Sequence, residues 1–213
     1  MKLYSGPLSL FTAKVRIVLA EKNLAYDRVE VGWNRRDRYL PHHPDVEAIN
    51  PKRQVPCLVD GDLVLYDSTV ILEYLEDRHP VPQLMPRDPA ARARCRLREL
   101  EADEVFFPHV WALIESRFYP GGDPSRGDEA TAGVVAYHQR LAGALGDREF
   151  LCGQFSVADI GNAVMLSAAS SLGVPVAPSL TTLAAWMARV ADRPAVAEEM
   201  AGMSQAAAAA MAD

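Results

Sequence analysis

The sequence predicts an α/β domain followed by an all-helical domain. Short β-prone runs alternate with helical runs up to about residue 80, whereas nearly everything after residue 90 has helical periodicity. Four prolines punctuate the stretch between these parts, which is typical of a linker. We therefore expect one domain over residues 1–79, a linker over residues 80–89 and a second domain over residues 90–213.

The order of elements in the first domain follows from its local patterns. The runs "MKLYS", "FTAKVRIVLAEKN" and "YDRVEV" form a β-α-β unit, which predicts a parallel strand pair with a crossover helix. The runs "PCLVD" and "LVLY" flank Asp60 and Gly61, a dipeptide suited to a tight antiparallel hairpin. A last helix, "DSTVILEYLEDRH", closes the domain, with Asp67 or Ser68 as its N-cap. Its expected apolar stripe comprises Val70, Ile71, Tyr74 and Leu75.

The second domain is expected to contain several helices. The first runs over residues 90–118 and is bent at Pro108, and others follow at about 128–146, 157–171 and 180–191. The apolar face of the helix over residues 90–118 would carry Leu97, Leu100, Val105, Trp111, Ile114 and Phe118. Within "FSVAD", Ser156 and Asp159 match a capping box, and we expect Asp159→Ala to lower the stability by about 1–2 kcal/mol.

Composition limits the classes of function. A net charge of −6 argues against nonspecific nucleic-acid binding. The sequence has no apolar run of about 18 residues and no basic, apolar leader, so we expect a cytoplasmic protein without a membrane partner. Cys57, Cys95 and Cys152 are odd in number and lack C-x-x-C spacing, which argues against a disulfide framework and a zinc site. We expect no metal and reduced cysteines.

Three motifs, taken with the two-domain order, resemble those of the cytosolic glutathione transferases. They are "NPKRQVPCL" at 50–58, "LYDSTVILEYL" at 65–75 and "FSVAD" at 155–159. Each motif alone is weak, but their order and spacing are specific. The resemblance covers essentially the whole chain. It implies a thioredoxin-like N-terminal domain, an all-helical C-terminal domain, a homodimer, and glutathione as cosubstrate.

The resemblance also implies a role for Ser9. Its stretch, "SLFTAKVR", resembles the Ser-Pro-Phe-x-x-x-Val-Arg pattern of serine-type transferases, with Leu10 in place of the proline. Ser9 precedes a helix whose N-terminus favours an anion, so its hydroxyl could donate to the glutathione thiolate without a neighbouring base. Ordinary N-capping is the alternative role for Ser9. Ser5 and Tyr4 are the other candidate hydroxyl donors.

The remaining glutathione contacts are likewise implied by the resemblance. Pro56 would follow a cis peptide bond and present the Val55 backbone to the ligand, with Gln54 donating to the glycine carboxylate. Asp67 and Ser68 would bind the γ-glutamyl ammonium and carboxylate at a helix start, where both also serve as ordinary capping residues. The positive charge for the glycine carboxylate would come from one of three side chains, Lys52, Arg53 or His43.

The electrophile pocket is expected between the domains, on the helix that carries Phe106, Phe107 and Trp111. Aromatic residues at helical spacing are also typical of a core. Arg117 and Tyr119 are possible polar contacts. The sequence does not identify the small hydrophobic electrophile.

The leading hypothesis is an enzyme that activates the glutathione thiol as a thiolate for attack on an electrophilic substrate. Dehalogenation and ether cleavage belong to the same class. An isomerase of the maleylacetoacetate or maleylpyruvate type is an alternative, although the zeta signature Ser-Ser-x-Ser-x-Arg-Val-Arg is not reproduced. A second alternative is a non-enzymatic scaffold similar to the stringent-starvation proteins, which associate with RNA polymerase. The intact "Q-V-P" and "D-S" contacts favour the enzyme.

Overall fold

The computed structural model describes residues 1–40, 42–119 and 121–212. The chain divides into two compact units. The first contains Met1–Gln83 together with the chain from Ala201 onward, and the second contains Leu84–Met200. Among the described residues, no helix combines the length and the apolar character needed to cross a membrane.

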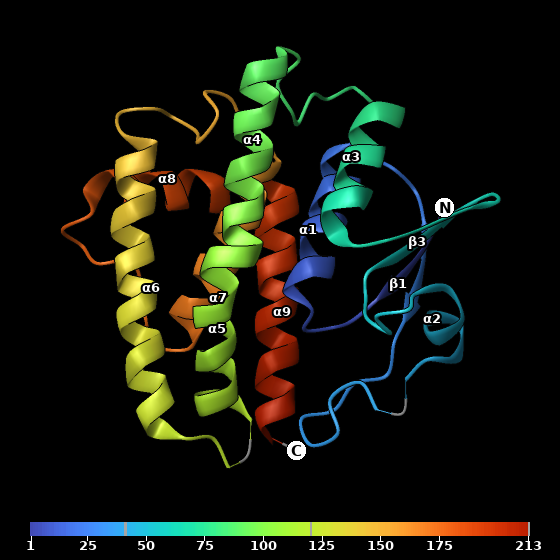
Figure 1. Cartoon of the computed structure of the whole chain (residues 1–213), viewed down its shortest axis with the longest axis horizontal. Helices are drawn as coiled ribbons and strands as arrows, with labels where there is room; N and C mark the ends of the chain where they lie inside the picture. Colours follow the sequence, from blue (N-terminus) through green and yellow to red (C-terminus); the bar gives the residue numbers. More distant parts are fainter. Residues whose placement is uncertain (41, 120, 213) are drawn as a thin grey trace. The chain divides into compact units, whose positions relative to one another are not determined.

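The first unit contains a four-stranded mixed sheet in the order β2-β1-β3-β4 (Figure 1). β1 (Lys2–Ser5) pairs in parallel with β2 (Asp27–Glu30), and β3 (Cys57–Asp60) pairs antiparallel with both β1 and β4 (Leu63–Tyr66). The hairpin turn places Gly61 at φ +60°, where a side chain would be strained. The predicted β-α-β and hairpin order is therefore confirmed.

Two helices of this unit pack against each other, α1 (Leu10–Glu21) and α3 (Ser68–Arg78). The predicted apolar stripe of α3 is partly wrong, because Val70 is 48% exposed whereas Leu72 is buried beside Ile71 and Leu75. The buried face is thus rotated by about one residue from the expected one. A short helix, α2 (Pro44–Ile49), was not predicted.

A buried ion pair links the far ends of α1 and α3. Lys22 Nζ donates to Glu76 Oε2 at 2.7 Å, and the side chains are 0% and 5% exposed. The same ammonium donates to the carbonyl oxygens of His79 and Pro82 at 2.7 and 2.8 Å. These bonds satisfy the lysine's three donors, as a buried charge requires.

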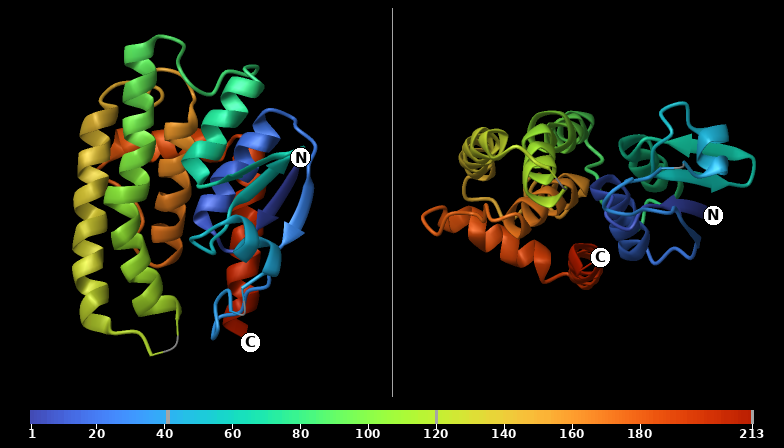
Figure 2. Two further views of the ribbon diagram at one scale, coloured as in Figure 1. Left: turned by 45° about the vertical axis from the view of Figure 1, so that its right-hand side comes forward. Right: turned by 90° about the horizontal axis from the view of Figure 1, so that it is seen from below.

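The second unit is helical. Its elements are α4 (Pro89–Glu101), the π-helical segment η1 (Ala102–Phe106), α5 (Phe107–Leu113), the π-helical segment η2 (Ile114–Phe118), α6 (Pro124–Leu145), α7 (Val157–Ser171), α8 (Thr181–Ala191) and α9 (Pro194–Ala212), which continues past the end of this unit. α6 lies beside α5, and α7 lies beside α4 (Figures 1 and 2).

The expected helix over residues 90–118 is interrupted twice. The segments η1 and η2 each widen the helical turn, and Pro108 follows η1 in the first turn of α5. The predicted apolar face was wrong in its first half, because Leu97, Leu100 and Val105 are exposed. The buried side instead carries Cys95, Glu99, Ala102, Phe106, Val110 and Leu113. These buried residues keep a spacing of three or four along the chain, so the buried face continues through η1 and lies on a different side of the helix from the expected one.

Asp159 organises the start of α7. Its Oδ2 accepts from Ser156 N at 2.9 Å, and Ser156 Oγ accepts from the backbone N–H of Asp159, which together form the predicted capping box. The same Oδ2 also accepts from Ser156 Oγ at 2.8 Å. Its Oδ1 accepts from Leu151 N at 2.9 Å and from Trp186 Nε1 at 2.8 Å. The carboxylate is fully buried, so it joins the preceding turn, α7 and α8 in one polar network.

Candidate functional site

Three loops of the first unit meet at one end of its sheet. Tyr4 at the end of β1 pairs with Cys57 at the start of β3, and Cys57 pairs with Tyr66 at the end of β4. The chain that follows β1, precedes β3 and follows β4 therefore emerges at the same end of neighbouring strands. These loops contain Ser9, the stretch Gln54–Pro56 and the pair Asp67–Ser68, respectively.

Ser9 is the N-cap of α1. Its backbone is extended, with φ −81° and ψ 110°, and its Oγ accepts a hydrogen bond from Thr12 N at 3.1 Å. The capping role is therefore real. Within the described part of the chain, the Ser9 hydroxyl proton has no acceptor, and the side chain is partly exposed. A capping serine accepts through its oxygen, so its proton stays available to an anion near the helix N-terminus.

The two other hydroxyl candidates are engaged elsewhere. Tyr4 donates its only hydroxyl proton to Asp45 Oδ2 at 2.7 Å, and this hydrogen bond raises the pKa of Tyr4. Ser5 is fully buried, and its Oγ accepts from Arg16 Nη1 at 2.6 Å. Neither hydroxyl is placed to donate to a ligand from solvent. Of the three candidates, Ser9 has the geometry of a donor.

The stretch from Gln54 to Pro56 follows a turn organised by Asn50. Asn50 is buried, its Nδ2 donates to the Gln54 carbonyl at 2.7 Å, and its Oδ1 accepts from Lys52 N at 2.9 Å. The Val55–Pro56 peptide bond is cis, as expected. Val55 is partly exposed and Gln54 exposed. Sequence reasoning missed Asn50, although the Asn-Pro dipeptide is itself a turn signal.

Asp67 and Ser68 begin α3. Asp67 has a left-handed φ of 75°, and its Oδ1 accepts from Thr69 N at 3.1 Å, which makes it the N-cap. An aspartate adopts this backbone at a cost, so the surrounding turn must impose it. Ser68, the first helical residue, is nearly buried. The free N–H groups of this helix start form an anion-binding end.

The three candidate cations have different surroundings. Lys52 Nζ lies 3.3 Å from Asp67 Oδ2, and Arg53 Nε lies 3.7 Å from Glu47 Oε1. His43 caps α2, because its Nδ1 accepts from Asp45 N at 3.2 Å. Lys52 and Arg53 are exposed, and exposed ion pairs are weak enough to exchange partners, whereas His43 accepts a hydrogen bond in its cap.

Comparisons with known proteins show which family the chain belongs to. The family described as glutathione S-transferase, N-terminal domain, matches residues 3–83. A stringent starvation protein A homolog from Coxiella burnetii is 37% identical over 84% of this chain and 80% of its own length. The chain belongs to the cytosolic glutathione S-transferase superfamily. A sphingomonad glutathione S-transferase, solved in complex with glutathione, matches with a TM-score of 0.79 and 26% identity, over 96% of this chain and 99% of that one.

One further relative of this superfamily member is named for an isomerase reaction. A maleylacetoacetate isomerase from Pseudomonas aeruginosa is 43% identical, but the match covers only 45% of each chain. These relatives are named for different functions, and membership of the superfamily alone does not select one activity.

The aromatic residues expected in the electrophile pocket differ in exposure. Phe106 is fully buried, and its ring stacks on Tyr137 at 4.1 Å between centroids. Phe107 and Trp111 are partly exposed and lie 6.0 Å apart between centroids. Arg117 donates to the Leu172 carbonyl and to Thr131 Oγ1, both at 2.6 Å, so it connects helices within the unit.

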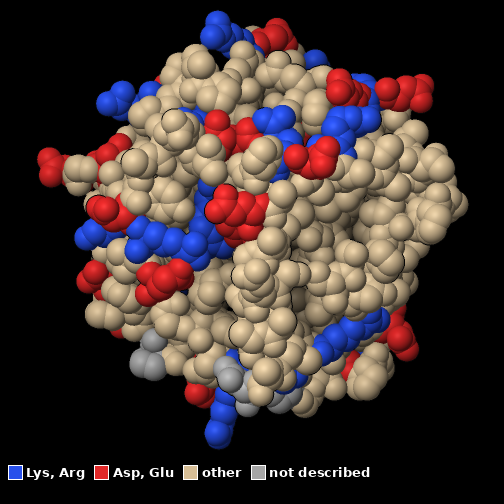
Figure 3. All heavy atoms as spheres, turned by 180° about the vertical axis from the view of Figure 1, so that it is seen from behind, with Lys and Arg blue, Asp and Glu red and all other residues tan. Residues whose placement is uncertain are grey.

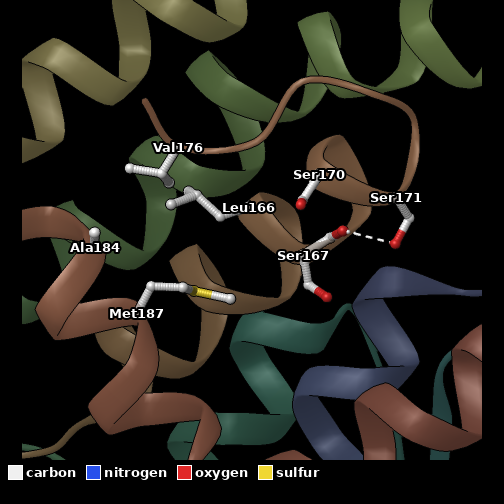
Figure 4. Close-up of a pocket in the computed structure, with 7 residues that line it drawn as sticks. All are labelled: Leu166, Ser167, Ser170, Ser171, Val176, Ala184 and Met187. Atoms are coloured by element: carbon white, nitrogen blue, oxygen red, sulfur yellow. Dashed lines mark hydrogen bonds between the residues drawn. The ribbon is translucent and has the colours of Figure 1, made fainter. Parts of the chain in front are cut away.

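The second unit of this transferase-fold chain also has a shallow pocket of about 270 Å³ (Figure 4). It lies between α7, α8 and the chain that joins them, and Ser171 Oγ donates to the Ser167 carbonyl at its edge. Its lining comprises Leu166, Ser167, Ser170, Ser171, Val176, Ala184 and Met187. None of these is an aromatic residue expected from the sequence.

Charged groups do not form an obvious second site. Among the residues that the structure describes, no group of three or more His, Cys, Asp or Glu side chains could hold a metal ion. On the face drawn in Figure 3, basic side chains lie among acidic ones, with broad uncharged areas between them.

Proposed function

We propose that this protein is a glutathione transferase in which Ser9 holds the glutathione sulfur as a thiolate for attack on an electrophilic substrate. The observation that carries the proposal is the convergence of three loops at one end of the sheet, with the Ser9 hydroxyl proton uncommitted. A ligand at this end can meet all three loops at once.

The chemistry required of Ser9 is modest. A free thiol has a pKa of about 8.5, and lowering it by two units requires about 2.7 kcal/mol of preferential thiolate stabilisation. One hydroxyl donor and the positive end of α1 are sufficient for this. The thiolate then attacks an electrophilic carbon, and the leaving group departs with its electron pair. No covalent intermediate with the protein is needed.

The other contacts would orient the tripeptide. The Val55 N–H and carbonyl would pair with the cysteinyl backbone, much as an added strand does. The α3 N-terminus and the Ser68 hydroxyl would bind the γ-glutamyl carboxylate, and Asp67 would bind its ammonium. Asp67 must then exchange its exposed partner Lys52, a pair worth less than about 1 kcal/mol. The freed Lys52, with Gln54, could meet the glycine carboxylate.

Calorimetry with reduced glutathione tests the proposal. We expect wild-type protein to bind glutathione, and Ser68→Ala to bind about tenfold more weakly because a hydrogen bond to a carboxylate is lost. Ser179→Ala removes a hydroxyl from an exposed turn of the second unit and is the matched control with unchanged affinity. Absence of binding to the folded wild type would contradict the proposal.

A non-enzymatic scaffold is the second candidate, and the identity to the stringent starvation protein A homolog favours it. A scaffold need not turn over a substrate even where the fold is retained. A thiol-dependent assay with chlorodinitrobenzene and a panel of other electrophiles separates the two. Turnover supports the transferase, whereas binding without any turnover supports the scaffold.

An isomerase is the third candidate, because the partial match includes a maleylacetoacetate isomerase. In that reaction glutathione would add to a double bond and leave again, so it would be regenerated. Glutathione consumption during turnover distinguishes the reactions: a transferase consumes it in proportion to product, and an isomerase does not. The pair Phe107 and Trp111 would contact a small hydrophobic substrate in either case.

A cytoplasmic homodimer completes the proposal. Three free cysteines are the state that a reducing cytoplasm maintains. The first unit exposes apolar side chains on β4 and α3, at Leu63, Val64, Tyr66 and Val70. The second unit exposes Leu97, Leu100 and Val105, and such patches support a subunit interface. Light scattering should give twice the chain mass, and Leu97→Glu should give monomers; a wild-type monomer would contradict the dimer.

A further inference from the structure

Two cysteines of the second unit are brought together by the fold. Cys95 lies in α4 and is fully buried, and Cys152 lies in the turn before α7 and is partly exposed. α4 and α7 lie side by side (Figure 1), and the side chains of Cys95 and Cys152 are in hydrogen-bonding contact. Thiols in contact are candidates for a covalent bond with each other.

The pair is chemically asymmetric. The hydrogen bond from the Cys95 thiol lowers the pKa of Cys152, and Arg148 acts in the same direction. Asp159 opposes this effect, and so does burial. The same hydrogen bond, together with burial, raises the pKa of Cys95. Exposure gives the same order, because Cys152 is partly exposed whereas Cys95 is fully buried, so Cys152 is the member that a small disulfide reaches first.

Ser156 also lies beside this pair, but its hydroxyl has another partner. The Ser156 Oγ donates to Asp159 Oδ2 at 2.8 Å, and a hydroxyl carries one proton only. Ser156 therefore cannot donate to the Cys152 sulfur at the same time. Cys95 is the donor that distinguishes Cys152 from an ordinary cysteine.

We propose that Cys95 and Cys152 form a reversible disulfide when the protein meets a low-molecular-weight disulfide, which makes this pair a redox modification site. The role proposed for Ser9 in holding the glutathione thiolate does not require Cys95 or Cys152, because both cysteines belong to the second unit. Cys57 is not expected to react with the small disulfide. It is buried in the first unit, and burial raises its pKa to about 11.

The reaction takes place in two exchange steps. The Cys152 thiolate attacks one sulfur of the small disulfide, a mixed disulfide forms, and the first small thiolate leaves and takes a proton from solvent. Cys95 then gives up its proton and attacks the Cys152 sulfur, which expels the second small thiolate, and that thiolate is protonated in turn. The two protein thiols are oxidised, and one small disulfide is reduced to two thiols.

The protein bond would join α4 to the turn before α7. That turn also contains Leu151, whose N–H donates to Asp159. The disulfide would therefore tie together the segments on which the Asp159 network is built. Because Cys152 is partly exposed, a small disulfide can reach it, whereas Cys95 reacts only through Cys152.

Peptide mapping by mass spectrometry under non-reducing conditions tests the proposal on the full chain. After exposure to glutathione disulfide and its removal, we expect a linked Cys95–Cys152 peptide that dithiothreitol reverses. Cys57→Ser, the matched control, should form the same link. Cys95→Ser should stop at a persistent glutathione adduct on Cys152.

Alkylation with iodoacetamide gives a second readout that needs no variant. At pH 7 we expect Cys152 to react at least about tenfold faster than Cys57 in the folded wild type. Unmodified thiols, a persistent glutathione adduct on wild-type Cys152, or equal alkylation rates would each overturn the proposal.

Discussion

The Tyr4 hydroxyl donates to the Asp45 carboxylate at 2.7 Å, which assigns its only proton to a neighbour within the first unit. The ring also lies edge-on to His43, with centroids 5.5 Å apart. Tyr4 thus joins β1 to the start of α2. A tyrosine in this position supports the loop geometry and has no proton left for a thiolate.

Tyr4→Phe should therefore lower stability without changing the chemistry. We expect a loss of about 1 kcal/mol in the free energy of unfolding, because one hydrogen bond to a carboxylate is removed while that carboxylate stays hydrated. Urea denaturation measures the loss. The pKa of bound glutathione should equal that of wild type, and a rise of one unit or more would show that Tyr4 contacts the sulfur.

Asp159→Ala should cost more than a capping box alone would. The structure adds the Leu151 N–H and Trp186 Nε1 bonds to those of Ser156, so four buried donors lose their acceptor. We expect a loss of about 3 kcal/mol or more, against the 1–2 kcal/mol expected from the sequence. Asp88→Ala, at the exposed N-cap of α4, is the control and should cost about 1 kcal/mol. Equal losses in the two variants would disprove the network.

Lys22→Met should destabilise the first unit by about 3–5 kcal/mol. The substitution leaves the Glu76 carboxylate buried without its cation. Adding Glu76→Met should recover at least half of that loss, because the uncompensated charge is then removed. Chemical denaturation of both single variants and the double variant gives the coupling free energy. Losses that simply add would mean that the two side chains do not interact.

His138 should make stability depend on pH. It is buried in α6, and burial lowers its pKa, so the folded protein resists protonation. Below the usual histidine pKa of about 6.5, the unfolded chain takes up a proton that the folded chain refuses. The free energy of unfolding should therefore fall as the pH falls from 7.5 to 5.5, at no more than about 1.4 kcal/mol per pH unit.

The matched variants isolate that contribution. His138→Phe should flatten the pH dependence of unfolding, because the residue no longer takes up a proton. His42→Gln, at a site outside the helical unit, should leave the wild-type slope unchanged. Identical slopes in wild type and His138→Phe would rule out His138 as the source.

The sheet of the first unit was predictable in part, because local patterns specify some of its strand pairings. Alternating β-prone and helical runs, and the Asp60-Gly61 turn, predict the order of elements along the chain, the parallel pair and the antiparallel hairpin. The pairing of β3 with β1 joins distant parts of the sequence, and these local patterns do not specify it. α2 was missed because it has only six residues, starting at Pro44, and its N-cap is an uncommon one, His43. The apolar face of residues 90–118 was misjudged because Leu97 and Leu100 are apolar but lie on the exposed side of α4, whereas the polar Glu99 is buried.

The candidate site was predictable only as a set of alternatives. Motifs indicated Ser9, Pro56 and Ser68, but local patterns could not show that Asp45 takes the Tyr4 proton, since 41 residues separate the two. The contact between Cys95 and Cys152 was hidden for the same reason, because it depends on how α4 packs against the start of α7. Such long-range partners come from tertiary packing.

The most direct test of the central proposal is the pH titration of bound glutathione, followed by its ultraviolet thiolate absorbance. In wild type and in Ser9→Thr, which keeps the hydroxyl, we expect an apparent thiol pKa about two units below the free value of about 8.5. In Ser9→Ala it should return toward the free value, with the fold retained by circular dichroism. An equally depressed pKa in Ser9→Ala and wild type would contradict the role proposed for Ser9.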